Sequence, residues 1–166
     1  MPDLLVLGIG PDDSIDQFRG AAGFRNAEAW LLAGSGHGGA AVYLWGYVVE
    51  MTIKAAWFAL LGYGDDQSIG LGDLRRAKEK ALSYKIVWPG NFHDLNCWAQ
   101  LLIRHRTFLK RPYTVYHFDR ALLAHSQRVY NRWREWLRYK KNVPYPFEVQ
   151  SVAESAGWFL KHSRDL

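Results

Sequence analysis

Apolar residues recur every three or four positions along most of the chain, which is the spacing of one face of an α-helix. No extended alternating run of β-branched residues indicates a strand, and no composition shift marks a domain boundary. The pattern therefore predicts one all-α domain, residues 1–166, in which four or five antiparallel helices pack as a bundle. The predicted helices cover residues 14–33, 38–61, 73–82, a segment that begins at Asn91 or Asp94 and ends before Pro112, 113–139 and 147–161.

The second predicted helix is apolar on nearly every face and long enough to span a membrane. Glu50 and Lys54, however, lie in its middle at an i,i+4 spacing, with the acid first, which is the favourable order for an ion pair on one face. Two charges in mid-span favour the central helix of a soluble bundle, so we expect no membrane partner. A buried pair of this kind either specifies the fold or belongs to a site in the bundle interior or at a dimer seam.

The cysteine content and the first residues of the chain bear on where in the cell the protein is expected. Cys97 is the only cysteine, which excludes an intramolecular disulfide and argues against a structural zinc site of the usual multi-cysteine kinds. The first residues are acidic and do not resemble a signal peptide. A reducing, cytoplasmic location is therefore the expectation. The eight Trp and nine Tyr predict either a wet groove or a subunit interface, because their NH and OH groups need polar partners.

Charge is distributed unevenly along the chain. Residues 1–70 carry a formal charge of −5 and residues 71–166 a formal charge of +10, and the segment 104–141 has 11 basic and 2 acidic residues. Near its start, four basic residues alternate with aromatic ones, a pattern that can hold single-stranded RNA through phosphate contacts and base stacking. The alternative is a solvated loop whose aromatic rings pack into the core. The predicted nucleic-acid-binding residues are Arg104, Arg106, Lys110 and Arg111.

Three stretches share their order and spacing with one family of small helical domains. The first runs from residues 29–34 into the second predicted helix with its Glu50 and Lys54; the second is the Phe-His-Asp-Leu of residues 92–95; the third is residues 130–139, followed by a proline-containing loop and a final helix of small residues. Together they resemble the HEPN family. The resemblance implies a helical bundle that commonly dimerises, and family members include RNase toxins, partners of small nucleotidyltransferases and non-catalytic interaction modules.

Ribonuclease members of that family carry an Arg followed four to six residues later by a His, contributed by both subunits of a dimer. Arg neutralises phosphate, and a His that titrates near neutral pH can exchange protons with a ribose hydroxyl. Arg120 with His125, and Arg111 with His117, match this spacing. Both depart from the family pattern, because an apolar residue rather than a polar one follows each Arg. On a straight helix Arg120 and His125 would lie about 140° apart, so a dimer would have to combine them.

Three further features have simpler structural readings. Asp119 falls on the apolar arc of the predicted helix 113–139, so we expect it to be buried beside a partner such as Lys54, a tyrosine or a histidine. The glycine-rich run at 34–39 is predicted to be an inter-helix turn, since it lacks the phosphate-loop spacing. His93 is expected to be a neighbour of a helix cap, and not a metal ligand.

The sequence thus predicts a HEPN-like module that binds RNA, a nucleotide or a protein partner, as a homodimer and in a defence or toxin–antitoxin setting. One alternative is a metal-independent endoribonuclease that uses an Arg/His pair. Another is the accessory subunit of a nucleotidyltransferase; an antitoxin is a further candidate partner. No metal site and no cofactor are expected.

Overall fold

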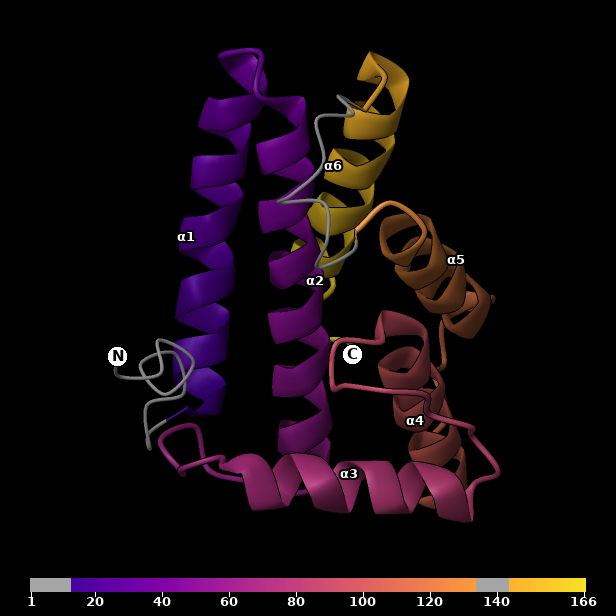
Figure 1. Ribbon diagram of the computed structural model, residues 1–166. Helices are drawn as coiled ribbons and strands as arrows, with labels where there is room; N and C mark the ends of the chain where they lie inside the picture. Colours follow the sequence, from indigo (N-terminus) through magenta and orange to yellow (C-terminus); the bar gives the residue numbers. More distant parts are fainter. Residues whose placement is uncertain (1–12, 134–143) are drawn as a thin grey trace.

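The computed structural model describes residues 13–133 and 144–166 (Figure 1). These two ranges contain six α-helices and no strand, which confirms the all-α prediction. Each of the six predicted helical segments corresponds to one of these helices, and one helix lies across the end of the molecule and not alongside the others. The helices are α1 (Ile15–Gly34), α2 (Gly38–Leu60), α3 (Leu71–Ser83), α4 (Leu95–Phe108), α5 (Phe118–Tyr130) and α6 (Pro146–Lys161).

Helices α1 and α2 form an antiparallel hairpin, as Figure 1 shows. The Ser14 hydroxyl caps α1 by accepting a hydrogen bond from the backbone N–H of Gln17 at 3.3 Å, so the predicted start at residue 14 is confirmed. A tight turn joins the two helices, and Gly36 allows it by adopting a φ of +82°. Asn26 of α1 then accepts a hydrogen bond from the Trp45 indole of α2 at 3.1 Å, which fixes the two helices relative to one another.

Helix α2 is the centre of the core, because α1, α4, α5 and α6 all pack against it. Gly46 is a position where a neighbouring side chain lies directly against the α2 backbone. A methyl group added there would lie 2.0 Å from Cδ1 of Trp133, far inside van der Waals contact. The missing side chain therefore makes the room that the buried Trp133 ring occupies.

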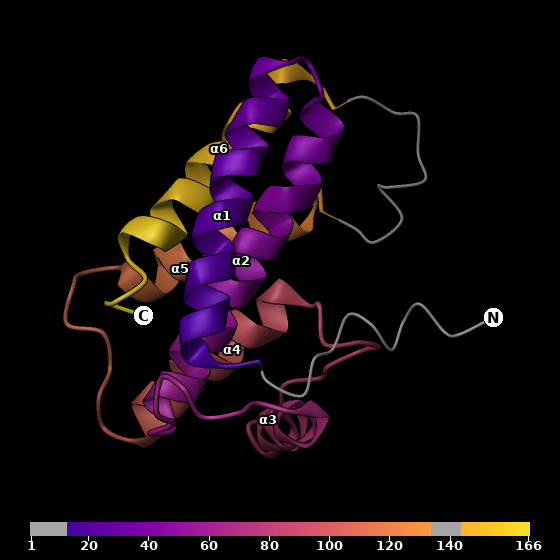
Figure 2. The same cartoon turned by 90° about the vertical axis from the view of Figure 1, so that its left-hand side faces the viewer.

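Helix α3 runs across the lower ends of α1 and α2 and is seen nearly end-on in Figure 2. Its first turn is closed by Asp73, whose carboxylate accepts a hydrogen bond from the backbone N–H of Gly70 at 2.9 Å. The predicted helix 73–82 begins two residues too late, since Gly70 is the capping residue and Asp73 is the third residue of the helix.

The second half of the chain forms α4, α5 and α6. Asp94 caps α4 by accepting a hydrogen bond from the backbone N–H of Cys97 at 2.9 Å, which confirms one of the two predicted starts. The predicted helix 113–139 begins too early. His117 has a left-handed φ of +59°, so α5 starts only at Phe118, and it ends at Tyr130. Residues 134–139 of that prediction lie outside the described residues.

Among residues 13–133 and 144–166, no helix has both the length and the apolar character that crossing a membrane requires.

Candidate functional site

Two buried charged residues lie in the middle of α2. Glu50 is 3% exposed and Lys54 is 7% exposed. The Lys54 ammonium donates a hydrogen bond to Oε1 of Glu50. Nδ1 of His93 lies 2.9 Å from Oε2 of Glu50 and 3.1 Å from Oε1. These three residues form what we call the Glu50–Lys54–His93 cluster.

Two separate parts of the fold bring the cluster together. Glu50 and Lys54 lie one turn apart on α2, so both face the same side of that helix. His93 comes from the short turn before α4, where its backbone N–H donates a hydrogen bond to Oδ1 of Asn91 at 3.2 Å. The Trp98 ring of α4 lies 5.7 Å from Nζ of Lys54 and covers the cluster from that side.

The electrostatics of the cluster favour a charged Glu50. Burial by itself would raise the pKa of this carboxyl, but the ammonium of Lys54 and the hydrogen bond from His93 outweigh it, so the pKa of Glu50 is lowered. Asp13 lies near the same ammonium, and there burial dominates: the pKa of Asp13 is raised, with Lys54 opposing the effect.

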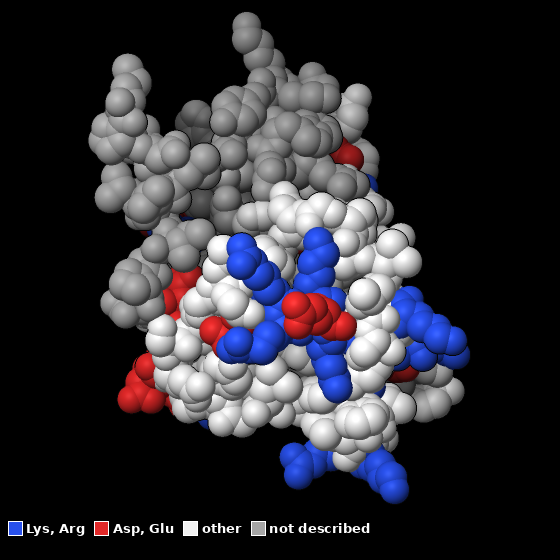
Figure 3. All heavy atoms as spheres, turned by 60° about the horizontal axis from the view of Figure 1, so that its bottom comes forward, with Lys and Arg blue, Asp and Glu red and all other residues white. Residues whose placement is uncertain are grey.

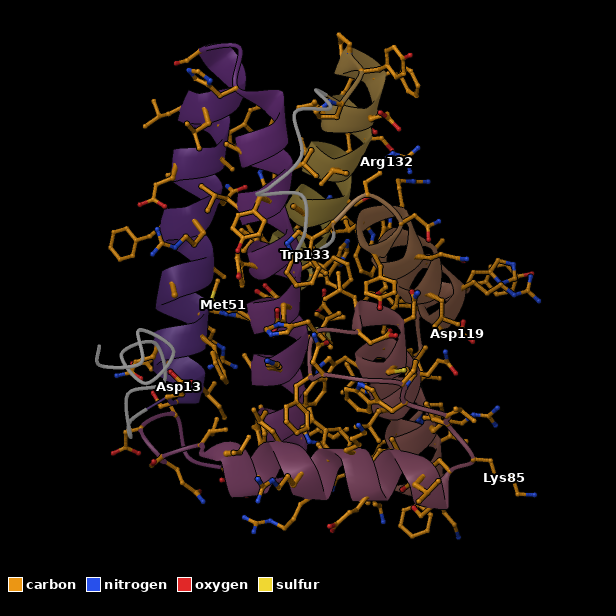
Figure 4. All side chains as sticks on the ribbon, in the orientation of Figure 1. Asp13, Met51, Lys85, Asp119, Arg132 and Trp133 are labelled. Atoms are coloured by element: carbon orange, nitrogen blue, oxygen red, sulfur yellow. The ribbon has the colours of Figure 1, made fainter. Side chains whose placement is uncertain are left out.

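The cluster borders a pocket of about 730 Å³, within the size range of small-molecule sites. We call it the α1–α2–α3 pocket. Met51, which lies between α1 and α2 in Figure 4, is part of its wall. Its polar and ionisable lining residues are those of the cluster together with Asp13, Gln17 and Tyr47. The rest of the lining is mainly apolar and includes Phe18, Phe24, Ile69, Leu71, Leu74 and Phe92.

The sequence prediction that Glu50 and Lys54 form a buried pair is confirmed. The role of His93 was missed. Its neighbour Asp94 carries a clear helix-cap signal, but no local pattern shows that the turn before α4 packs against the middle of α2. The pairing of His93 with Glu50 spans 43 positions and arises only from the tertiary fold.

Asp119 is exposed, so the prediction that it is buried is wrong. That prediction assumed a helix that begins at residue 113. Because α5 begins at Phe118, the Phe118 ring takes the buried position and Asp119 lies in the first helical turn, where a negative charge is favourable. Figure 4 shows Asp119 on the outer side of α5. Lys54, one of its expected partners, pairs with Glu50 instead.

The two predicted Arg/His pairs differ in their surroundings. His125 is half-buried: its Nδ1 lies 3.1 Å from the Ser155 hydroxyl and its ring stacks on Trp158 at 4.7 Å. Burial first, and then the charges of Arg128 and His162, lower its pKa. The arginine beside it is Arg128, with Nη1 3.5 Å from Nδ1, whereas Arg120 is exposed and is not bonded to His125 within the described chain.

The second pair, Arg111 and His117, lies on the surface. Both residues are exposed, and the His117 ring lies 3.6 Å from that of its neighbour Tyr116, which is 86% exposed. The described residues show no contact between the Arg111 and His117 side chains. The structure therefore brings neither pair together within the described chain.

The predicted RNA-binding segment meets α3 at the lower end of the molecule. Phe108, the last residue of α4, is 64% exposed, and Nζ of Lys80 from α3 lies 4.9 Å from its ring. Arg104 is exposed one turn earlier on α4, hence on the same side as Phe108. Lys110 and Arg111 follow and are exposed as well.

Helix α3 contributes further basic residues that the sequence reasoning did not include. Together, residues 71–85 and 104–111 carry nine Lys or Arg and two Asp or Glu. Figure 3 shows Lys and Arg side chains gathered on this end around a smaller acidic group, and Lys85 reaches outward in Figure 4. We call this surface the α3–α4 basic face; its basic residues are Lys80, whose Nζ lies beside the Phe108 ring, and the exposed Arg104, Lys110 and Arg111.

Arg106 is the exception among the four predicted RNA-binding residues. It is half-buried, donates hydrogen bonds to the carbonyl oxygens of Leu166 at 2.7 Å and Arg111 at 3.2 Å, and stacks on Tyr113 at 4.4 Å. Its guanidinium thus ties the end of α4 to residue 166. The structure gives it a positioning role within the fold.

Comparison of the chain with models of known protein families, with curated proteins and with solved structures finds no match. Within the described residues, no three His, Cys, Asp or Glu side chains are grouped so as to hold a metal ion. Function must therefore be inferred from the pocket and the basic face themselves.

Proposed function

We propose that this chain is a HEPN-like helical module that binds single-stranded RNA through the α3–α4 basic face. The observation that carries the proposal is the position of Phe108. Its ring is 64% exposed at the end of α4 and has Lys80 beside it and Arg104 one turn away. An exposed ring flanked by cations offers a nucleobase a stacking platform and the adjoining phosphates a counter-charge.

The charge distribution supports the same function over a wider surface. Basic residues lie on two helices that meet at Tyr84 and Phe108, whose ring centres are 6.0 Å apart, so positive charge from both helices adds at this end of the molecule. The face holds few acidic residues to neutralise it. Such a field attracts phosphate without regard to sequence, while the aromatic ring favours unpaired bases over a duplex.

The electrostatic half of the proposal is tested by the salt dependence of RNA binding. Fluorescence anisotropy with a mixed-sequence single-stranded RNA should show affinity falling steeply with salt, and Arg104→Ala should reduce the slope of log affinity against log salt by about 0.7, the value for one phosphate contact on a single strand. Arg25→Ala, which removes an exposed arginine from α1, is the matched control and should leave the slope unchanged. Equal effects of the two substitutions would rule out the basic face as the binding surface.

The stacking half is tested separately. Phe108→Ala should weaken binding of single-stranded RNA by about 1–3 kcal/mol, or about fivefold to 150-fold, without changing the salt slope. Phe24 on α1 is also exposed, at 75%, so Phe24→Ala is the control for loss of a surface ring. If Phe108→Ala and Phe24→Ala bind RNA as the wild type does, base stacking is not part of the function.

A second candidate function, metal-independent RNA cleavage, is favoured by the contact between His125 and Arg128. The lowered pKa of His125 keeps its imidazole neutral at pH 7, the form that can accept a proton from a ribose hydroxyl. Cleavage of an RNA pool in excess EDTA by the wild type, and its loss in His125→Ala, would support this function. Equal cleavage by both proteins would refute the assignment of His125.

A further inference from the structure

The α1–α2–α3 pocket combines an apolar wall with one charged pair. Glu50 and Lys54 are both more than nine-tenths buried and both line the pocket. Burying two charges is costly, and an apolar replacement of similar volume is often at least as stable. A charged pair that borders an open pocket of about 730 Å³ is thus placed where a ligand can use its hydrogen-bonding groups.

Both members of the pair retain hydrogen-bonding capacity. The ammonium of Lys54 has three N–H groups, and Glu50 is the one acceptor that the described residues provide for it. Oε2 of Glu50 accepts from His93, and a carboxylate oxygen can accept a second hydrogen bond. A donor and an acceptor therefore adjoin one another at the pocket wall.

The charges determine which ligand suits this arrangement. The formal charges of Glu50 and Lys54 cancel, so an anion would meet the carboxylate and a cation would meet the ammonium. Besides Asp13, Gln17 and Tyr47, the remaining wall is mainly apolar and rich in aromatic rings, among them Phe18, Phe24 and Phe92. We propose that the pocket binds a neutral aromatic compound that carries a hydrogen-bond acceptor next to a donor, such as a carboxamide. The acceptor would meet Lys54 and the donor Oε2 of Glu50.

Three compounds with one ring system and three charges test this proposal. Isothermal titration with naphthamide, naphthoate and naphthylmethylammonium should show that the neutral amide binds most tightly to the wild type. Glu50→Gln leaves Lys54 without its counter-charge and should shift the preference to naphthoate. Lys54→Met leaves the carboxylate and should shift it to the ammonium compound. An anion or cation that binds the wild type as tightly as the amide would overturn the proposal.

A pair of glycine substitutions tests the location without touching the charges. Gly20 lines the pocket, and Gly23 lies one turn further along α1 outside it; both positions have open space for a side chain. Gly20→Leu should weaken naphthamide binding by at least about tenfold, equivalent to 1.4 kcal/mol, and Gly23→Leu should leave it unchanged. Equal affinities of the two variants, or no binding of any of the three compounds to the folded wild type, would refute the proposal.

Discussion

Removing one member of the Glu50–Lys54 pair should destabilise the protein far more than removing both. Lys54→Met leaves a carboxylate that is 3% exposed without its main counter-charge. Breaking a buried ion pair in this way typically costs about 3–5 kcal/mol. Because His93 still donates a hydrogen bond to Glu50, we expect the free energy of unfolding to fall by about 3 kcal/mol. This is a large share of the total stability of a typical domain, which is about 5–15 kcal/mol.

The double variant Glu50→Leu with Lys54→Met removes both charges and replaces them with apolar groups of similar size. Such replacements are often neutral or stabilising. We expect its free energy of unfolding to lie within about 1 kcal/mol of the wild type, which implies a coupling energy between the two sites of at least about 2 kcal/mol. Urea denaturation followed by circular dichroism measures all four proteins of the cycle.

The contribution of Glu50 to the free energy of unfolding should change with pH in opposite directions in the wild type and in Lys54→Met. In the wild type the pKa of Glu50 is below its usual value of 4.5, so its stabilising contribution is present at neutral pH and is lost as the pH falls through the folded-state pKa. Without Lys54, burial is opposed only by His93 and the pKa should rise. The deficit of Lys54→Met should then be largest at neutral pH and shrink on acidification. If Lys54→Met is as stable as the wild type at pH 7, Glu50 and Lys54 are not energetically coupled. The same conclusion follows if the stability losses of the two single variants add up to that of the double variant.

Two further predictions concern packing and reactivity. Gly46→Ala should lower the free energy of unfolding by about 1–3 kcal/mol, because the added methyl group would overlap the Trp133 ring. Gly23→Ala, at a position with open space, is the control and should raise it by about 0.5–1 kcal/mol. If both variants change stability alike, the packing of Trp133 against Gly46 is contradicted. Burial, followed by the charge of Asp94, raises the pKa of Cys97 to about 12, so iodoacetamide should modify the native thiol at least about a hundredfold more slowly than in urea. Rapid modification of the native protein would show that Cys97 is accessible.

The parts of the fold that sequence predicted well are those with local determinants. The start of α1 follows from the Ser14 cap, and the α1–α2 turn follows from a glycine run that includes Gly36. The start of α4 follows from Asp94. In each case the residue that begins or ends the helix lies within a few positions of the boundary. The local sequence is therefore enough to predict where the helix starts or stops.

The errors arose where distant contacts decide the structure. His117 adopts a left-handed conformation that no residue preference predicts, and the late start of α5 moved Asp119 from the predicted core to the surface. The same limit applies to the candidate sites. The spacing of Glu50 and Lys54 predicted their pairing along one helix, but neither His93 nor the contribution of α3 to the basic face could be read from local sequence.

Helix α3 separates the two proposed binding surfaces. Leu71 and Leu74 on one side line the α1–α2–α3 pocket, and Lys80 on another side contacts the Phe108 ring. The pocket holds a compensated charge pair that gives RNA phosphate no net attraction, and the basic face lacks the enclosed apolar wall that a neutral compound needs. Substitutions at Glu50 or Lys54 should therefore change naphthamide binding without altering the salt slope of RNA binding, and Arg104→Ala should do the reverse. If each substitution weakens binding of only one of the two ligands, the pocket and the basic face are separate binding sites on the same protein.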